Sequence, residues 1–168
     1  MPSSAQFPPT QCKLFFALLW NKDHQNIEDF KFLLEKEWGK IKRDFRPSYF
    51  PMVRYYRKEM GENLDRAYLF IEGHFDRDVL SKAKNWAMDF EQKSSIIEKR
   101  IINIDPGLLC LEQVLLISTK PFSHRISIPG NLYIELTYIY EKNHYKCLPW
   151  TYPDYAQEEV IKVFEQER

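Results

Sequence analysis

The chain has 168 residues, of which 44% are hydrophobic and 15% are aromatic. This is enough apolar material for one packed core, and it excludes a mainly disordered chain. Lysine plus arginine and aspartate plus glutamate each number 24, so the formal net charge is zero. Bulk nucleic-acid binding usually needs a basic excess, because much of its affinity comes from releasing counterions from phosphates. We therefore expect no bulk nucleic-acid binding, and we expect any phosphate to bind in a local site.

The cysteines and the N-terminal residues indicate a cellular location. Cys12, Cys110 and Cys147 lie far apart, and no Cys-x-x-Cys pair is present, which is typical of reduced thiols and disfavours a zinc site of ordinary spacing. The first residues lack the basic-then-apolar order of a secretory signal. The apolar run 14–20 is too short to cross a bilayer. We expect a cytoplasmic protein without membrane association, and the sequence leaves its oligomeric state open.

The N-terminal two thirds of the chain predict an alternation of strands and helices. Residues 1–11 carry three prolines and two serines, which indicates a loose lead-in before a single α/β domain over residues 12–168. The expected elements are a central strand at 13–20, a helix over 27–41, strands within 50–57 and at 67–72, a helix from Asp76 to Phe90, and a strand at 100–105. This β-α-β-β-α-β order is that of the ferredoxin-like arrangement.

The C-terminal third predicts a strand at 114–119 and then a β-hairpin. The apolar residues of the hairpin share one face only if Arg125 lies opposite Glu135, with residues 129–131 (Pro-Gly-Asn) in the loop. A short terminal helix follows. The predicted fold class is therefore α/β (α+β): a ferredoxin-like unit extended by a C-terminal β-hairpin and a short terminal helix.

Asp105 is the first candidate functional residue. It ends the expected strand at 100–105 and precedes Pro106-Gly107, which predicts a turn. A carboxylate at a strand end points toward the sheet edge where ligands commonly bind, and it suits a metal ion or a substrate hydroxyl. The alternative is that Asp-Pro-Gly is only a turn signal, in which the aspartate accepts local backbone hydrogen bonds.

The second candidate lies within residues 118–125, where three hydroxyls, a lysine, a histidine and an arginine come close together. Lys120 and Arg125 suit a phosphate, Thr119 adds a hydroxyl, and His124 suits proton transfer near neutral pH. The alternative is a solvated loop, with Arg125 paired across the hairpin to Glu135. Exposed pairs of that kind contribute about 0.2–1 kcal/mol.

Three further candidates lie elsewhere in the C-terminal third and before it. Glu135 and Thr137 share one strand face with Tyr133, which favours a groove over open water. Trp150 opens the aromatic stretch 150–155, which would either wall a pocket or pin the last helix to the body. Tyr56 has the same two interpretations.

Six sequence blocks, taken together and in this order, resemble a known bacterial family. They are residues 55–61 (YYRKEMG), 103–107 (NIDPG), 118–120 (STK), 124–126 (HRI), 135–137 (ELT) and 150–155 (WTYPDY). The family is the one catalogued as domain of unknown function forty-four sixteen. The resemblance implies that the polar candidates above fall inside the signature blocks of the family.

The first functional interpretation is a pocket that binds or acts on a phosphate-bearing small molecule or nucleotide. In it, Asp105 and Glu135 would hold magnesium, and His124 and Asp105 would be the catalytic residues. The ligand-binding residues would be Lys120, Arg125, Thr119, Thr137, Tyr56 and Trp150. The sequence leaves open whether the protein is an enzyme, and it favours metal-dependent phosphoryl or phosphoester chemistry if it is one.

The second functional interpretation is a non-catalytic RNA- or protein-binding module with a ferredoxin-like sheet. RNA binding of this kind uses aromatic side chains exposed on the sheet. Tyr68, Phe70 and Tyr138 are the residues that would serve.

Overall fold

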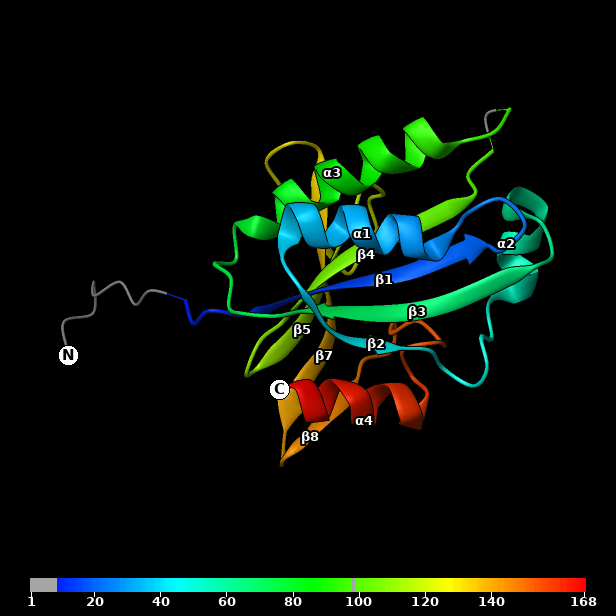
Figure 1. Ribbon diagram of the computed structural model, residues 1–168. Coiled ribbons are helices and arrows are strands. Elements are labelled where there is room, and N and C mark those ends of the chain that lie inside the picture. The colour runs from blue at the N-terminus through cyan, green and yellow to red at the C-terminus, as the bar shows by residue number, and fades with distance from the viewer. Residues whose placement is uncertain (1–8, 98) are drawn as a thin grey trace, which may run out of the picture.

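The computed structural model describes residues 9–97 and 99–168, so most of the predicted lead-in over residues 1–11 lies outside the described part. The described residues form a mixed α/β fold with four helices and one eight-stranded antiparallel sheet (Figure 1). None of these helices is long and apolar enough to cross a membrane.

Four strands form the first part of the sheet, in the order β2-β3-β1-β4, and each pairs antiparallel with its neighbour. They are β1 (Lys13–Asn21), β2 (Ile41–Phe45), β3 (Leu64–Ile71) and β4 (Ile102–Leu109). The central strand β1 is buried along nearly its whole length, because successive side chains enter two separate cores.

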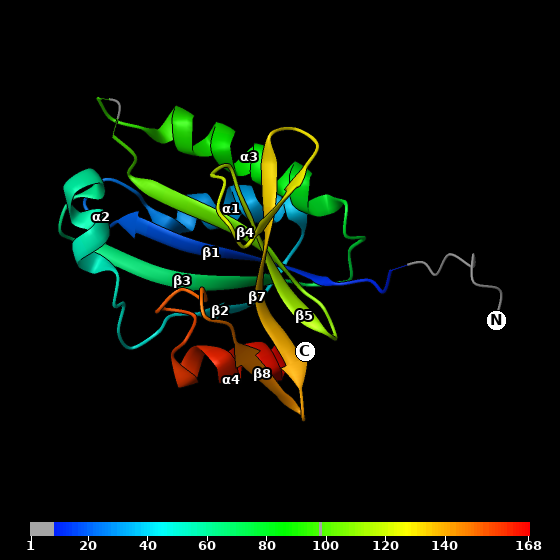
Figure 2. The ribbon, with the colours of Figure 1, turned by 180° about the vertical axis from the view of Figure 1, so that it is seen from behind.

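The helices cover the two faces of this sheet unequally. α1 (Ile27–Trp38) and α3 (Val79–Ser94) pack on one face, whereas α4 (Glu158–Glu167) packs on the opposite face (Figure 2). α2 (Val53–Met60) lies at one end of the sheet (Figure 1).

The second part of the sheet continues from β4. Its strands are β5 (Gln113–Ser118), β6 (Arg125–Ile128), β7 (Leu132–Glu141) and β8 (His144–Cys147), with β7 pairing to the other three. Figure 2 shows β5 and β7 running across the direction of β1 and β3. The mixed α/β class is confirmed, but the eight-stranded sheet is larger than the predicted ferredoxin-like unit extended by a hairpin.

The first half of β4 has a free edge, because β5 pairs only with Gly107–Leu109. Side chains of α3 satisfy the free backbone there: the Ile104 amide donates to Glu91 Oε1 at 2.6 Å, and Lys84 Nζ donates to the Ile104 carbonyl at 3.4 Å. Burial raises the pKa of Glu91 above its ordinary value. Residues two apart in a strand direct their N–H groups to the same edge of the sheet, so residue 106 faces the free edge as Ile104 does. Pro106 has no N–H, and at this edge no neighbouring strand is present to accept one.

The turn predicted at Pro106-Gly107 is wrong, because β4 runs through both residues to Leu109. The reason is that residues of β1 pair with Pro106 and pack against Gly107. Pro106 pairs with Phe16 of β1, and a Cβ added at Gly107 would lie 2.2 Å from Phe15 Cζ. Glycine at position 107 therefore makes room for the ring of Phe15 and does not form a turn.

The strand predicted within residues 50–57 is also wrong, because this segment forms α2. Met52, Tyr56 and Met60 recur at helical spacing, and Met60 is buried. The second strand is β2, which begins at Ile41, the last residue expected in the first helix. Gly39, with φ of +102°, ends α1 one residue after Trp38 and lets the chain turn into β2.

The hairpin register is confirmed, since Arg125 pairs with Glu135 and Ile128 with Leu132. Asn131 in the loop has φ of +57°, a conformation that asparagine tolerates well. The prediction of reduced thiols is wrong for two cysteines, because a disulfide joins Cys12, the residue before β1, to Cys110, the residue after β4. The pair was missed because their closeness depends on the pairing of β1 with β4, which brings together residues 98 apart in sequence.

Candidate functional site

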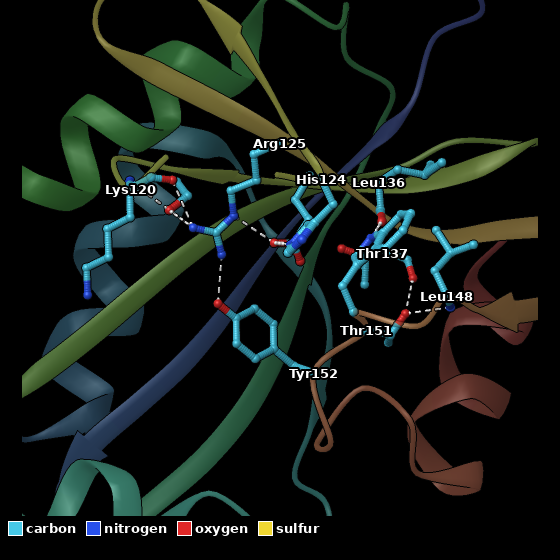
Figure 3. A network of polar contacts seen from close by, with 11 residues as sticks. Lys120, His124, Arg125, Leu136, Thr137, Leu148, Thr151 and Tyr152 are labelled. Atoms are coloured by element: carbon cyan, nitrogen blue, oxygen red, sulfur yellow. Dashed lines mark hydrogen bonds and ion pairs between the residues drawn. The ribbon is translucent and has the colours of Figure 1, made fainter. Parts of the chain in front are cut away.

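Glu135 on β7 is the centre of a buried polar network, whose members His124, Arg125 and Tyr152 are labelled in Figure 3. Its side chain is only 1% exposed. One carboxylate oxygen, Oε2, accepts a hydrogen bond from Arg125 Nε at 2.8 Å and lies 3.0 Å from His124 Nε2. The other oxygen, Oε1, has no hydrogen-bond partner among the described residues. The Arg125–Glu135 pair is therefore a buried ion pair and not the solvated cross-strand pair considered from the sequence.

Arg125 ties three segments of the chain together. Beyond Glu135, its guanidinium donates to Ser118 Oγ at 3.1 Å, to the Lys120 carbonyl at 2.9 Å and to Tyr152 Oη at 2.8 Å. An arginine has five N–H donors, and these contacts leave few of them for a ligand. Arg125 thus neutralises Glu135 and positions the loop after β5, while its predicted role as a phosphate ligand stays a prediction.

His124 is held in a fixed orientation by aromatic rings. Its imidazole stacks on Trp150 with ring centres 5.0 Å apart and planes 8° from parallel, and Phe122 lies 4.9 Å away. Trp150 is itself fixed, because its indole N–H donates to the Leu136 carbonyl of β7 at 2.7 Å. With Nε2 directed at Glu135, the second nitrogen, Nδ1, is the one left for other chemistry.

Thr137 extends the network along β7. It is fully buried, and its hydroxyl has no hydrogen-bond partner among the described residues. Its carbonyl accepts a hydrogen bond from Thr151 Oγ1 at 2.7 Å, which fastens the aromatic stretch to the strand (Figure 3). Two buried polar atoms without a partner among the described residues therefore come from positions two apart on one strand, Glu135 and Thr137.

Asp105 lies in a separate polar group. Its carboxylate accepts a hydrogen bond from Asn103 Nδ2 at 2.6 Å and lies 3.5 Å from Lys84 Nζ. Within residues 9–97 and 99–168, no hydrogen bond or ion pair joins Asp105 to Glu135. The charges of both carboxylates affect the pKa of Tyr152. Burial raises this pKa, the Arg125 guanidinium opposes the rise, and Glu135 and Asp105 add to it.

The remaining predicted residues lie around this network. Lys120 and Thr119 are exposed, and Figure 3 shows the Lys120 side chain directed away from the Arg125 guanidinium. Tyr56 on α2 is half-buried, and burial together with the charge of Asp105 raises its pKa. The structure therefore brings His124, Arg125, Glu135 and Trp150 together and leaves Asp105 and Tyr56 outside their hydrogen bonds.

Four side chains that contact the network were not among the predicted site residues: Ser118, Phe122, Thr151 and Tyr152. Ser118 and Phe122 lie in the polar block 118–125, and Thr151 and Tyr152 lie in the aromatic stretch 150–155, so the sequence indicated these segments but not these residues. The described residues contain no group of three or more histidine, cysteine, aspartate or glutamate side chains placed to hold a metal ion.

The fold and the site together define a mixed α/β protein with a buried Glu–His–Arg network on the second part of its sheet. The chain belongs to the family described as Domain of unknown function (DUF4416), whose model matches residues 10–168. Comparison with curated proteins and with solved structures gave no match.

Proposed function

We propose that the protein binds, and acts on, a phosphate-bearing small molecule such as a nucleotide at the network around Glu135. The observation that carries this proposal is the buried carboxylate itself. One of its oxygens is shared by His124 and Arg125, and the other has no partner among the described residues. Leaving a buried polar atom unpaired costs about 1–3 kcal/mol. A ligand hydroxyl or amine that bonded Glu135 Oε1 and Thr137 Oγ1 would remove this cost.

His124 would move the proton. When Glu135 accepts the Nε2 hydrogen, the neutral imidazole keeps a lone pair on Nδ1, which is the state of a general base. Stacking on Trp150 restricts the ring, so the proton acceptor keeps one direction. The pair would act on a ligand hydroxyl or on a water molecule beside the phosphate.

Lys120 would supply the cation for the phosphate. It is exposed, and the described residues contain no ion-pair partner for its ammonium group. Thr119 lies beside it and adds a hydroxyl. Because Arg125 is engaged with protein acceptors, Lys120 is the better candidate for direct contact with the ligand.

Magnesium binding by Asp105 and Glu135 stays a prediction. Each carboxylate has its own cation in the structure, Lys84 beside Asp105 and Arg125 beside Glu135. We therefore derive no chemical step through a metal ion. Magnesium belongs in the experiment as a variable.

A thermal-shift screen tests the proposal. The panel would contain adenosine and guanosine mono-, di- and triphosphates, ribose 5-phosphate and inorganic phosphate, each with and without magnesium. A ligand present at about 100 times its Kd stabilises the fold by about 2.7 kcal/mol. We expect at least one organic phosphate to raise the Tm of the wild type, and we expect Glu135→Gln to abolish this rise.

Glu141→Gln is the matched control, because Glu141 lies on the same strand but its side chain is exposed. It should respond to the ligand as the wild type does. A panel in which no phosphate compound changes the Tm would contradict the proposal, and so would an equal response from both glutamine variants.

The RNA-binding alternative is not favoured by the positions of its aromatic residues. Tyr68, Phe70 and Tyr138 are 0%, 1% and 0% exposed, because they pack beneath α4. These side chains are not available to stack on bases.

The ferredoxin-like unit also belongs to this proposal. Its support is the order β2-β3-β1-β4, the antiparallel pairing of neighbours, and the packing of α1 and α3 on one face.

The cytoplasmic location stays a prediction as well. Disulfides are rare in a reducing cytosol, so the bond between Cys12 and Cys110 argues against it. Trapping the thiols of rapidly acid-quenched cells, and locating the protein by fractionation, would decide the question.

A further inference from the structure

A second candidate site lies at the C-terminal end of α2. A hollow of about 370 Å³ is bounded there by the last turn of α2, by Asn21 and His24 at and after the end of β1, and by residues 96, 97 and 99–101. Neither Glu135 nor any residue bonded to it lines this hollow. The volume lies within the range of about 300–1,000 Å³ that is typical of small-molecule sites.

The charges around the hollow are mostly positive. Among the described residues, Arg57, Lys58, Lys99 and Arg100 line it, against one acidic residue, Glu59. In a chain whose formal net charge is zero, this is a local excess of positive charge.

Two of these four cations are already neutralised within the protein. Arg100 binds Glu59 through two nitrogens, at 2.6 and 2.9 Å, and Arg57 lies 3.6 Å from Glu62. For Lys58 and Lys99, the described part of the chain offers no ion-pair partner. Among the described residues, the charge at the hollow that has no ion-pair partner is therefore that of the two ammonium groups of Lys58 and Lys99.

The floor of the hollow is apolar, and two carbonyls at the end of α2 are already hydrogen-bonded. Met60 and Ile101 are buried side chains that line it. The Met60 carbonyl accepts a hydrogen bond from Asn21 Nδ2 at 2.7 Å, and the Gly61 amide donates to the Arg57 carbonyl at 3.0 Å. Because these carbonyls at the helix end are occupied, they do not compete for the lysine side chains.

We propose that this hollow binds a small amphipathic anion, a carboxylate or phosphate group carried on an apolar body. The two ammonium groups would bind the acidic group, and the apolar floor would cover the body. The site shares no residue with the Glu135 network, so it does not depend on the function proposed there.

An NMR titration of the full chain tests this proposal. The chain has five glycines, whose amide signals are readily distinguished. Gly61 lines the hollow, whereas Gly130 lies in the hairpin loop and serves as the internal reference. The probes are hexyl phosphate, hexanoate, 1-hexanol and inorganic phosphate, each at the same concentrations. We expect one or both amphipathic anions to move the Gly61 signal and to leave that of Gly130 in place.

The lysines are tested with a double variant, Lys58→Gln with Lys99→Gln. We expect it to bind the anions about tenfold more weakly, a change of roughly 1.4 kcal/mol. Lys36→Gln is the matched control, because Lys36 lies in the last turn of α1, at the opposite end of that helix from the hollow. In the wild type, binding should weaken as the salt concentration rises, because exposed charges are screened.

The two anions distinguish a phosphate site from a carboxylate site, and either result supports the proposal. Three results would overturn it: a Gly61 signal that neither anion moves, hexanol binding as tightly as the anions, or a double variant that binds like Lys36→Gln. The salt series on the wild type gives the same decision if the double variant does not fold.

Discussion

Two buried pairs of arginine and carboxylate lie on this sheet, and they have different surroundings. Arg66 and Asp154 are joined at 2.6 Å, with side chains that are 6% and 5% exposed. Arg125 and Glu135 are joined at 2.8 Å, with side chains that are 8% and 1% exposed. By distance and burial the two pairs are nearly equal.

The groups around the first pair, Arg66 and Asp154, serve only to stabilise its two charges. Tyr68 Oη donates to the same Asp154 oxygen at 3.1 Å, and the Arg66 guanidinium lies over the rings of Phe50, Tyr68 and Tyr155. One donor, Arg66 Nε, has no hydrogen-bond partner among the described residues, but ring faces attract cations. This pair fastens the segment before α4 to β3.

The second pair is surrounded by groups that can react. Its carboxylate binds a histidine as well as an arginine, and one of its oxygens is unpaired within the described chain. Burial of an ion pair therefore does not mark a functional site by itself. Our proposal of a functional site at Glu135 rests instead on the open acceptor beside the His124 imidazole.

Removing the charge of Asp154 should have the largest effect on stability. Asp154→Asn leaves the Arg66 guanidinium buried without a counter-charge, and breaking a buried pair in this way costs about 3–5 kcal/mol. Urea denaturation of the wild type and the variant measures the loss. The double variant Arg66→Met with Asp154→Leu should recover most of it, because apolar side chains of similar volume remove both charges together. A loss below about 1 kcal/mol in the single variant would contradict a structural role.

Removing the charge of Glu135 should cost less stability and more function. Arg125 keeps Ser118, Lys120 and Tyr152 as acceptors in Glu135→Gln, so the expected loss is that of one charge-assisted hydrogen bond, about 1.5–3 kcal/mol. Ligand binding in the thermal-shift screen should disappear, whereas Asp154→Asn should still bind at temperatures where it is folded. Equal ligand responses from the two variants would remove the distinction between the pairs.

Local patterns of the sequence predicted the elements that depend on local chemistry. The apolar run at 13–20 predicted β1, and the alternation around residues 129–131 predicted the hairpin register, which places Arg125 against Glu135. The closeness of these two residues was therefore available from the sequence. That Arg125 is also bound by the Tyr152 hydroxyl was not, because this contact depends on the path of a later segment.

The features that were missed depend on contacts between distant parts of the chain. Nothing near Arg66 in sequence indicates a partner 88 residues away. The same holds for Asp105: its local pattern looks like a turn, but pairing with β1 keeps it within a strand. The separation of Asp105 from Glu135 follows from β5 meeting only the last residues of β4, which no local pattern encodes.

Replacing His124 by phenylalanine separates stacking from proton transfer. A phenyl ring keeps the contact with Trp150, so we expect a change in the free energy of unfolding within about 1 kcal/mol. The nitrogen that meets Glu135 is lost, so turnover of any ligand found in the screen should fall to background. His144→Phe is the control, because His144 is an exposed histidine that pairs with a different glutamate. Full turnover in His124→Phe would show that the imidazole only fills space.

The smallest expected effects come from Asp105 and Lys120, and they test whether a metal ion connects the two polar groups. If Asp105 helps to hold magnesium, Asp105→Asn should abolish any magnesium-dependent rise in Tm, because the amide keeps the volume and removes the charge. Lys120→Ala should weaken a phosphate ligand and leave the response to magnesium unchanged, because it removes only the partner of the anion. Without ligand, each change should cost about 1 kcal/mol or less, which corresponds to roughly 2–4 °C in a domain of this size. Asp89→Asn, at an exposed position of α3, is the control for the loss of a carboxylate.

A purely structural role predicts another pattern: Asp105→Asn lowers the Tm because Lys84 loses its partner at 3.5 Å, and magnesium changes the Tm of no variant. In that case the difference between the two ion pairs would not involve a metal ion, and the chemistry would depend on Glu135 and His124.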